Sequence, residues 1–306
     1  MKKTMVSVLI PTFNAEKDIE LLLKKIYDQK LKENQELEVV IVDSSSTDNT
    51  INVIREKFPS VIMKVIDNEK FNHGGTRNYL ADISRGDYLL YLTQDAIPYN
   101  QELIQELLSS FENQNVEICY ARQIPKKDAK PLEVFARNFN YPDKDTIKDK
   151  SKLKDLGIKT FFNSNVCSMY RRTAFEAYSQ FPDNIILNED MILASKVILD
   201  GKFVSYNSRA MVYHSHNYNL KQQFKRYFDI GMAFHQTSYL LKYASNEKEG
   251  VRMVINQIKY LYSQKKPIYI PYAIVESGMK FIGYNMGKKS RYIPLPLKRK
   301  FSAYMK

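Results

Sequence analysis

The sequence predicts an α/β protein in which a Rossmann-like, mostly parallel sheet is flanked by helices and followed by a C-terminal helical extension. Apolar runs typical of buried strands alternate with segments of helical periodicity in the N-terminal third of the chain. Strands and helices that alternate in this way form parallel pairs connected by right-handed crossovers. After Leu220 the alternation gives way to helical patterns rich in Tyr, Lys and Met and broken by prolines.

The N-terminal elements follow one another in strand and helix order. The first apolar run ends at Pro11, and the SSSTDNT sequence after the second run supplies residues that cap a helix. The HGGTRN sequence is a loop that begins a further helix. In chain order we expect a strand at 6–10, a helix at 16–30, a strand at 38–42, a helix over 51–58, a strand at 61–66, a helix after 73 and a strand at 88–92.

The middle of the chain is less regular. Residues 123–160 are rich in Lys and Asp and have little periodicity, so we expect a mobile insertion at the rim of the sheet. Further helices are expected at 172–179 and 190–200, before two short strands at 203–206 and 210–213. We therefore divide the chain into an α/β domain of residues 1–220 and a helical extension of residues 221–306.

The basic charge is confined to the extension. The formal net charge is +12, and residues 221–306 carry 17 Lys and Arg against four Asp and Glu, whereas residues 1–220 carry 29 against 30. A nucleic-acid-binding protein usually has its basic patch on the folded reading surface, so we expect no nucleic acid partner.

The cysteines and the hydropathy indicate a cytoplasmic protein without a membrane-spanning helix. Cys119 and Cys167 lie far apart in apolar surroundings, which is typical of free, buried thiols in the reducing cytoplasm. The apolar run after the basic N-terminus is too short for a signal peptide. No run approaches the roughly 18 apolar residues of a spanning helix, so any membrane contact is expected to be peripheral.

Polar residues follow the expected strands in the sequences VSVLIPTFN, VVIVDSSSTDNT, FNHGGTRN and LLYLTQDAIP. Ligands bind outside the carboxyl ends of the strands in such sheets. Asp43 at the end of the second strand can accept hydrogen bonds from a base or a ribose, and Pro11, Thr12 and Phe13 would form the other wall of that pocket. The alternative for Asp43 is a helix cap.

The HGGTRN sequence has the features of an anion-binding loop. Paired glycines let backbone approach a ligand closely, and the N-terminus of a helix favours an anion. Arg77 adds a positive charge four residues after His73. A loop with a surface arginine is the alternative.

The order and spacing of these motifs resemble the family 2 glycosyltransferases of the GT-A fold, and FNHGGTRN with LTQDA and HSHNY is similar to the rhamnosyltransferase branch. The resemblance covers residues 5–220. It implies transfer of a sugar from a nucleotide-sugar donor to a glycan, with inversion. The favoured donor is dTDP-rhamnose, and a UDP-sugar is the alternative. His73, Arg77 and Gln94 join the residues of the base pocket in the implied donor site.

The resemblance also implies a divalent cation. The family usually has Asp-x-Asp where this chain has Thr93, Gln94 and Asp95, so one carboxylate is missing. Mg²⁺ or Mn²⁺ can be held by one or two carboxylates together with phosphate oxygens. His214 matches the histidine that completes the metal site, and His216 is expected to be a phosphate or structural partner. Alternatively, Asp95 caps a turn and both histidines bond to backbone.

The NED sequence is expected to begin a helix and to carry the catalytic base. Asp190 corresponds to the base of the family, and Asn188 and Glu189 are assigned to acceptor or structural hydrogen bonds. The alternative is helix capping by these residues.

The extension mixes Tyr and Phe with Lys and Arg, as do elements that bind anionic lipid. We therefore expect a protein at the inner face of the cell membrane with a lipid-linked glycan as acceptor. A solvated basic face or a homo-oligomer contact is the alternative for the extension.

Other functions of the whole protein are also considered. A nucleotidylyltransferase would need a Gly-rich, basic loop after the first strand, which PTFNAEKD lacks. A non-enzymatic RNA-binding protein and an inactive sugar-nucleotide-binding relative are further alternatives.

Overall fold

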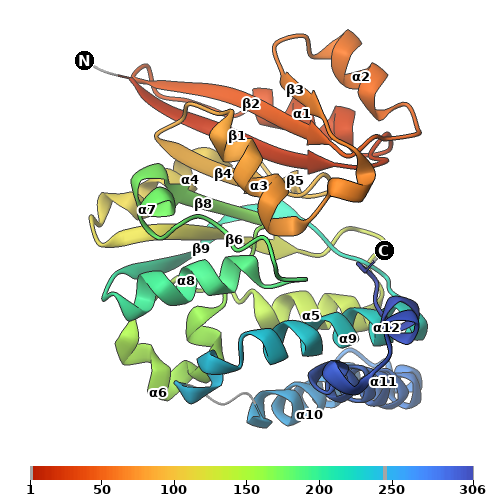
Figure 1. The fold of residues 1–306 in the computed structure, drawn as a ribbon. Helices are drawn as coiled ribbons and strands as arrows, with labels where there is room; N and C mark the ends of the chain where they lie inside the picture. Colours follow the sequence, from red (N-terminus) through yellow and green to blue (C-terminus); the bar gives the residue numbers. More distant parts are fainter. Residues whose placement is uncertain (1–2, 244–246, 306) are drawn as a thin grey trace.

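A nine-stranded sheet forms the centre of the computed structural model, which describes residues 3–243 and 247–305. The strand order is β3-β2-β1-β4-β8-β6-β9-β5, and β7 pairs with β9 (Figure 1). The strands are β1 (Thr4–Thr12), β2 (Gln35–Asp43), β3 (Ile62–Val65), β4 (Tyr88–Leu92), β5 (Ile97–Pro98), β6 (Val116–Ile124), β7 (Thr146–Lys148), β8 (Cys167–Arg171) and β9 (Phe203–Tyr213).

Helices lie on both faces of this sheet. The helices are α1 (Ile19–Tyr27), α2 (Thr50–Lys57), α3 (His73–Asp82), α4 (Leu103–Ser109), α5 (Pro131–Asn140), α6 (Leu153–Leu156), α7 (Arg172–Ala177), α8 (Glu189–Leu199), α9 (Leu220–Gln236), α10 (Glu247–Ser263), α11 (Ile270–Lys288) and α12 (Leu295–Phe301). Short 3₁₀ helices connect several of them, among which η4 (Gly157–Phe161) precedes β8.

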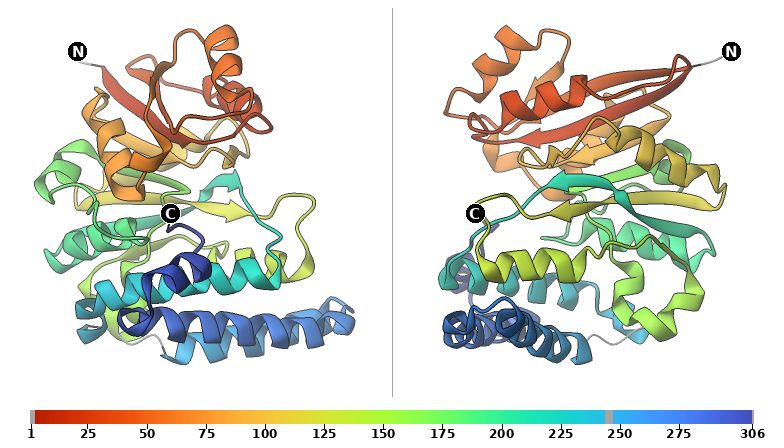
Figure 2. Two further views of the ribbon diagram at one scale, coloured as in Figure 1. Left: turned by 45° about the vertical axis from the view of Figure 1, so that its right-hand side comes forward. Right: turned by 180° about the vertical axis from the view of Figure 1, so that it is seen from behind.

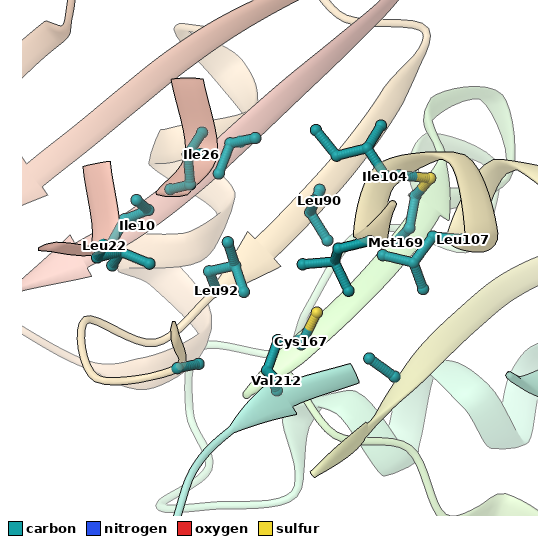
Figure 3. Packing of buried hydrophobic residues seen from close by; sticks show 14 of the residues in the cluster. Ile10, Leu22, Ile26, Leu90, Leu92, Ile104, Leu107, Cys167, Met169 and Val212 are labelled. Carbon is teal, nitrogen blue, oxygen red and sulfur yellow. The ribbon is translucent and has the colours of Figure 1, made fainter. Parts of the chain in front are cut away.

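Alternation of side chains along the strands explains the two-sided core. Val8 and Ile10 of β1 pack with α1, α2 and α4, whereas Leu9 packs on the opposite face with α3, α7 and α8. Figure 3 shows Ile10 beside Leu22 in the first of these clusters. A strand covered on both faces is apolar at successive positions, which is why the β1 sequence reads as one continuous run.

The predicted parallel sheet is confirmed for the first four strands. β1 pairs in parallel with β2 and β4, and β2 pairs in parallel with β3. β8 then enters antiparallel between β4 and β6, and β6 returns to parallel pairing with β9. The sheet is therefore mixed, because the strand and helix alternation that predicts parallel pairing ends after β4.

Residues 123–160 contain more regular secondary structure than their sequence indicates. Residues 123 and 124 end the central strand β6, and α5, β7, α6 and η4 occupy most of the remainder. Leu132 and Phe135 bury the apolar side of α5, a pattern that the surrounding Lys and Asp residues hide in the sequence. The two short strands expected after 203 form one strand, β9, whose pairing with β6 shifts register after Asn207.

The extension forms a helical layer at the end of the molecule opposite the N-terminal strands (Figures 1 and 2). Helices α9 and α11 cross closely, since a Cβ on Gly287 would lie 2.0 Å from the Phe228 carbonyl oxygen and one on Gly231 would lie 2.2 Å from that of Tyr284. Leu240 packs into the same core cluster as α3 and α8. Within the described residues, no helix combines the length and the hydrophobicity needed to cross a lipid bilayer.

Candidate active site

Two loops bring Asp95, His214 and His216 together. Asp95 lies between β4 and β5, and the two histidines follow β9. The Oδ2 atom of Asp95 lies 3.5 Å from His214 Nε2 and 3.3 Å from His216 Nε2, and the two Nε2 atoms are 3.1 Å apart. Each residue thus offers a ligand atom, and these atoms lie within 4.8 Å of one another.

The structure places His216 in this cluster as fully as His214. The resemblance favoured His214 as the ligand, with His216 as a phosphate or structural partner. However, β9 ends at Tyr213, and the chain turns so that both rings face Asp95. Tyr218 stacks on the His216 ring at a centroid distance of 5.0 Å and helps to fix its direction.

Both histidines are suited to be neutral ligands. Burial lowers the pKa of His214 to about 3, and burial also lowers the pKa of His216. An imidazole must be neutral to offer a lone pair to a cation. One carboxylate oxygen and two imidazole nitrogens that converge therefore fit a divalent cation, with further positions left for phosphate oxygens or water.

Asp190 lies at the start of α8 and is held by backbone amides. Its carboxylate accepts hydrogen bonds from Asn165 N at 3.0 Å and from Met191 N at 2.7 Å. Burial, followed by the negative charge of neighbouring Glu189, raises the pKa of Asp190 to about 7. A carboxylate with this pKa can accept a proton near neutral pH and still release it afterwards.

Glu189 has a structural partner rather than a free carboxylate. Its side chain lies 3.2 Å from Arg77 Nη1 and accepts a hydrogen bond from Asn165 Nδ2 at 3.2 Å. Burial would raise the pKa of Glu189, but the charge of Arg77 and further contacts lower it overall. The positive charge of Arg77, which the sequence places near a donor, is thus balanced by Glu189 in this structure.

Asn188 precedes Asp190 in a left-handed conformation, with φ of 69°. Its side chain makes no capping hydrogen bond, and its Nδ2 atom is buried without a partner in the described part of the chain. The capping alternative therefore does not apply to the side chain of Asn188.

The turn between η4 and β8 connects the base to the histidine cluster. Gln123 contacts His214 Nδ1 through its Oε1 atom at 2.9 Å and donates through Nε2 to Ser164 Oγ at 2.9 Å. The next residue, Asn165, donates to Asp190. Asp95, Asp190 and His214 therefore belong to one site, linked by side-chain contacts and by the adjacent residues Ser164 and Asn165, although they lie far apart in the sequence.

The residues expected at the nucleotide base lie at the ends of β1 and β2. Asp43 is fully buried, and its oxygens accept hydrogen bonds from Thr12 Oγ1 and from the backbone and side chain of Ser46. Phe13 is 43% exposed; its backbone N–H donates to Gln94 Oε1, and Gln94 Nε2 donates to its backbone carbonyl oxygen. Asp43 and Gln94 hold this wall in place, and Phe13 offers the exposed face. Pro11 lies beside them in β1, opposite Val42.

The glycines of HGGTRN pack closely against other parts of the protein. A Cβ on Gly74 would lie 2.0 Å from the Pro182 carbonyl oxygen, and a Cβ on Gly75 would meet the Asn72 side chain. These glycines allow close packing within the protein. His73 packs edge-on against the Tyr304 ring at 5.0 Å, and burial lowers its pKa to about 4.

The extension supplies a cation that the sequence did not single out. Arg226 of α9 donates to Tyr304 OH at 3.2 Å and lies 5.8 Å from the Tyr218 ring centroid. Its charge adds to the effect of burial in lowering the pKa of His73, His214 and His216. No ion pair in the described part of the chain neutralises Arg226. In the sequence, Arg226 is one basic residue in the middle of an amphipathic helix, so no local motif identifies it as a residue of the site.

Known proteins resemble the chain in sequence. Residues 7–179 match the family model described as glycosyl transferase family 2. The O-antigen chain rhamnosyltransferase WbaN of Salmonella anatum is 40% identical over 299 residues, which cover 97% of this chain and 94% of that protein. The O-antigen chain rhamnosyltransferase RfbN of Salmonella typhimurium is 39% identical over 300 residues, which cover 98% and 94%.

The fold also has a solved counterpart. The mannosyltransferase PcManGT from Pyrobaculum calidifontis, in complex with GDP-Man and Mn²⁺, matches with a TM-score of 0.61 at 16% identity, covering 96% of this chain and 77% of that chain. At this identity the likeness concerns the fold alone. The family match and the two relatives that extend over nearly the whole chain show that this protein belongs to glycosyl transferase family 2, as a glycosyltransferase of the GT-A fold.

Proposed function

We propose that the protein transfers L-rhamnose from dTDP-rhamnose to a hydroxyl group of a lipid-linked glycan during synthesis of a cell-surface polysaccharide. The observation that carries this proposal is the connection of Asp190, with a pKa of about 7, to the Asp95, His214 and His216 cluster through adjacent residues. The choice of rhamnose is supported by the two O-antigen rhamnosyltransferases, which resemble the chain over nearly its full length.

The donor would lie along the carboxyl ends of β1, β2 and β4. Thr12 and Phe13, held by Asp43 and Gln94, would flank the base. Arg226, which has no acidic partner in the described residues, would face the diphosphate. His73, Arg77 and Asn188 would border the sugar on the side of Asp190.

The reaction would be a single displacement with inversion. Asp190 accepts the proton of the acceptor hydroxyl while that oxygen bonds to the anomeric carbon. The bond from this carbon to the diphosphate oxygen breaks, and dTDP leaves with the electron pair. A positioned base contributes a factor of about 10² to 10⁴ in rate.

A divalent cation fits the cluster and would be held by Asp95, His214 and His216. It would supply positive charge against the charge that develops on the departing diphosphate. Mg²⁺ strongly prefers an all-oxygen shell, so the two imidazole nitrogens favour Mn²⁺ over Mg²⁺.

The extension would place the protein on the cytoplasmic face of the cell membrane. Ile268 is 84% exposed and Phe281 and Tyr292 are each 70% exposed, among many Lys and Arg residues. Apolar and basic side chains together favour an anionic lipid surface. The same face would be the contact if the chain forms a homo-oligomer.

Flotation with anionic vesicles tests this part of the proposal. A variant with Lys289, Arg299 and Lys300 changed to Glu should lose vesicle binding, whereas a control with Arg55, Lys32 and Lys64 changed to Glu should keep it. Equal binding by both variants would refute the role of the extension.

A donor screen tests the function itself. The protein is incubated with Mn²⁺, membranes that contain lipid-linked glycan, and dTDP-rhamnose, UDP-glucose or GDP-mannose, each with a labelled sugar. We expect label in the lipid fraction from dTDP-rhamnose, with a glycosidic configuration opposite to that of the donor. Transfer from another nucleotide sugar but not from dTDP-rhamnose would refute the assignment of the donor.

A further inference from the structure

Gln123 at the end of β6 is in contact with four polar groups of the site. It is 1% exposed. Its Oε1 atom faces Arg137 Nη1 and His214 Nδ1, and its Nε2 atom lies 2.7 Å from Tyr141 OH and 2.9 Å from Ser164 Oγ. We propose that Gln123 is a positioning residue that holds His214 in the tautomer able to bind a divalent cation and ties this ligand to the turn that supports Asp190.

The orientation of the Gln123 amide follows from its neighbours. A guanidinium has only N–H donors, so the group that faces Arg137 must be the carbonyl oxygen Oε1. His214 Nδ1 lies 2.9 Å from the same oxygen, closer than the 3.4 Å to Arg137 Nη1, and because that oxygen can only accept, Nδ1 carries the proton. The Nε2 atom of His214 is then the one with the lone pair, and it points at His216 and Asp95.

The nitrogen of the same amide bonds to the residues on the Asp190 side of the site. It donates to the hydroxyl groups of Tyr141 and Ser164. Asn165, which follows Ser164, donates its backbone N–H to Asp190 and its side-chain amide to Glu189. One buried side chain thus links a candidate cation ligand to the residues around the base.

Two substitutions separate this role from packing. In Gln123→Met the volume is nearly conserved, but the acceptor for His214 and Arg137 is lost. In Gln123→Glu the acceptor remains, next to Arg137. Removal of the partner of a metal-binding histidine typically weakens metal affinity about 10- to 100-fold. The inference rests on the cation site of the proposed function.

The test measures Mn²⁺ affinity of the full chain in the presence of dTDP, from the electron paramagnetic resonance signal of free Mn²⁺. We expect Gln123→Met to bind Mn²⁺ about 10- to 100-fold more weakly than the wild type and Gln123→Glu to remain close to it. Gln29→Met is the matched control, since Gln29 is buried and bonds Lys25, Asn100 and Ile104 away from the site. Wild-type affinity in Gln123→Met, or equal loss in Gln123→Glu, would overturn the inference.

Asp95→Asn separates the two possible failures. If Asp95→Asn loses Mn²⁺ and Gln123→Met does not, only the role of Gln123 fails. If the wild type binds no more Mn²⁺ than Asp95→Asn, the proposed cation site fails, and the role of Gln123 fails with it.

Nitrogen-15 NMR of the histidines reports the tautomer of His214 directly in the wild-type protein. We expect a proton on Nδ1 of His214, identified by comparison with His214→Gln, and a proton on Nε2 would contradict the inference.

Discussion

Arg77 and Glu189 form an ion pair with a separation of 3.2 Å, and each side chain is only 6% exposed. The pair joins α3 to the first turn of α8. Arg77 keeps Glu189 ionised, and the charge of Glu189 adds to burial in raising the pKa of Asp190. Two adjacent carboxylates thus have different protonation behaviour because their surroundings differ.

The dependence of activity on pH should report Asp190. The base is protonated below its pKa of about 7, so kcat/KM should fall about tenfold for each pH unit below that value and reach a plateau above it. Glu189→Gln removes the charge that raises this pKa, so the fall should move to lower pH. A steady-state assay of dTDP release between pH 5 and 9 measures both profiles.

The exposed Glu56→Gln variant is the control for this prediction and should keep the wild-type profile of kcat/KM against pH.

The raised pKa of Asp190 also affects the stability of the fold, with a defined sign. The folded state retains a proton between pH values of about 4 and 7 that the unfolded state has lost, so this group makes the free energy of unfolding fall as pH rises through that window. If kcat/KM of Glu189→Gln falls at the same acidic pH as that of the wild type, this result would contradict the coupling of the two carboxylates.

His216 should contribute to cation binding as much as His214. Both rings face the same Asp95 oxygen, at 3.3 and 3.5 Å. Substitution of either by Gln should weaken Mn²⁺ binding at least about tenfold, because one of three protein ligands is lost. Calorimetric titration with Mn²⁺ and dTDP measures this, and exposed His235→Gln is the matched control. Unchanged affinity in His216→Gln would leave His214 as the histidine ligand that the sequence favoured.

The crossing of α9 and α11 should depend on Gly287. A Cβ there would lie 2.0 Å from the Phe228 carbonyl oxygen, whereas a Cβ on Gly278 of the same helix meets nothing within 4 Å. Gly287→Ala should lower the free energy of unfolding by about 1–3 kcal/mol, as overpacking does. Gly278→Ala should raise it by up to about 1 kcal/mol, through helix propensity. Urea denaturation compares the two.

Gly287→Ala should also weaken donor binding, since α9 carries Arg226 into the site. A Gly287→Ala protein that is as stable as Gly278→Ala would show that the helices do not cross as closely as described.

The sequence predicts those parts of the site that follow recognisable strands. Asp95 and His214 each come just after an apolar run, so the topology of a parallel sheet places them at one edge before any coordinates exist. Gln123 also ends a strand, but the charged residues around it hide the periodicity of β6 and α5. The same rule would have found it had β6 been recognised.

Other features depend on tertiary contacts that no local pattern encodes. Arg226 reaches the site because α9 packs back against the sheet domain, and Gly74 is needed because Pro182 lies against it. The antiparallel entry of β8 likewise depends on where the chain returns after η4. Sequence periodicity reports which elements form, whereas long-range packing decides which side chains meet.

The most direct test of the catalytic proposal is the rate of Asp190→Asn, measured by single-turnover transfer of labelled rhamnose alongside its affinity for dTDP and Mn²⁺. Asparagine can still accept one of the two hydrogen bonds from Asn165 and Met191, which go to different oxygens of Asp190, but it cannot take up the proton of the acceptor. We predict a rate lower by about 10² to 10⁴ with ligand affinity nearly unchanged. A variant that transfers rhamnose at close to the wild-type rate would contradict the role of Asp190 as the base.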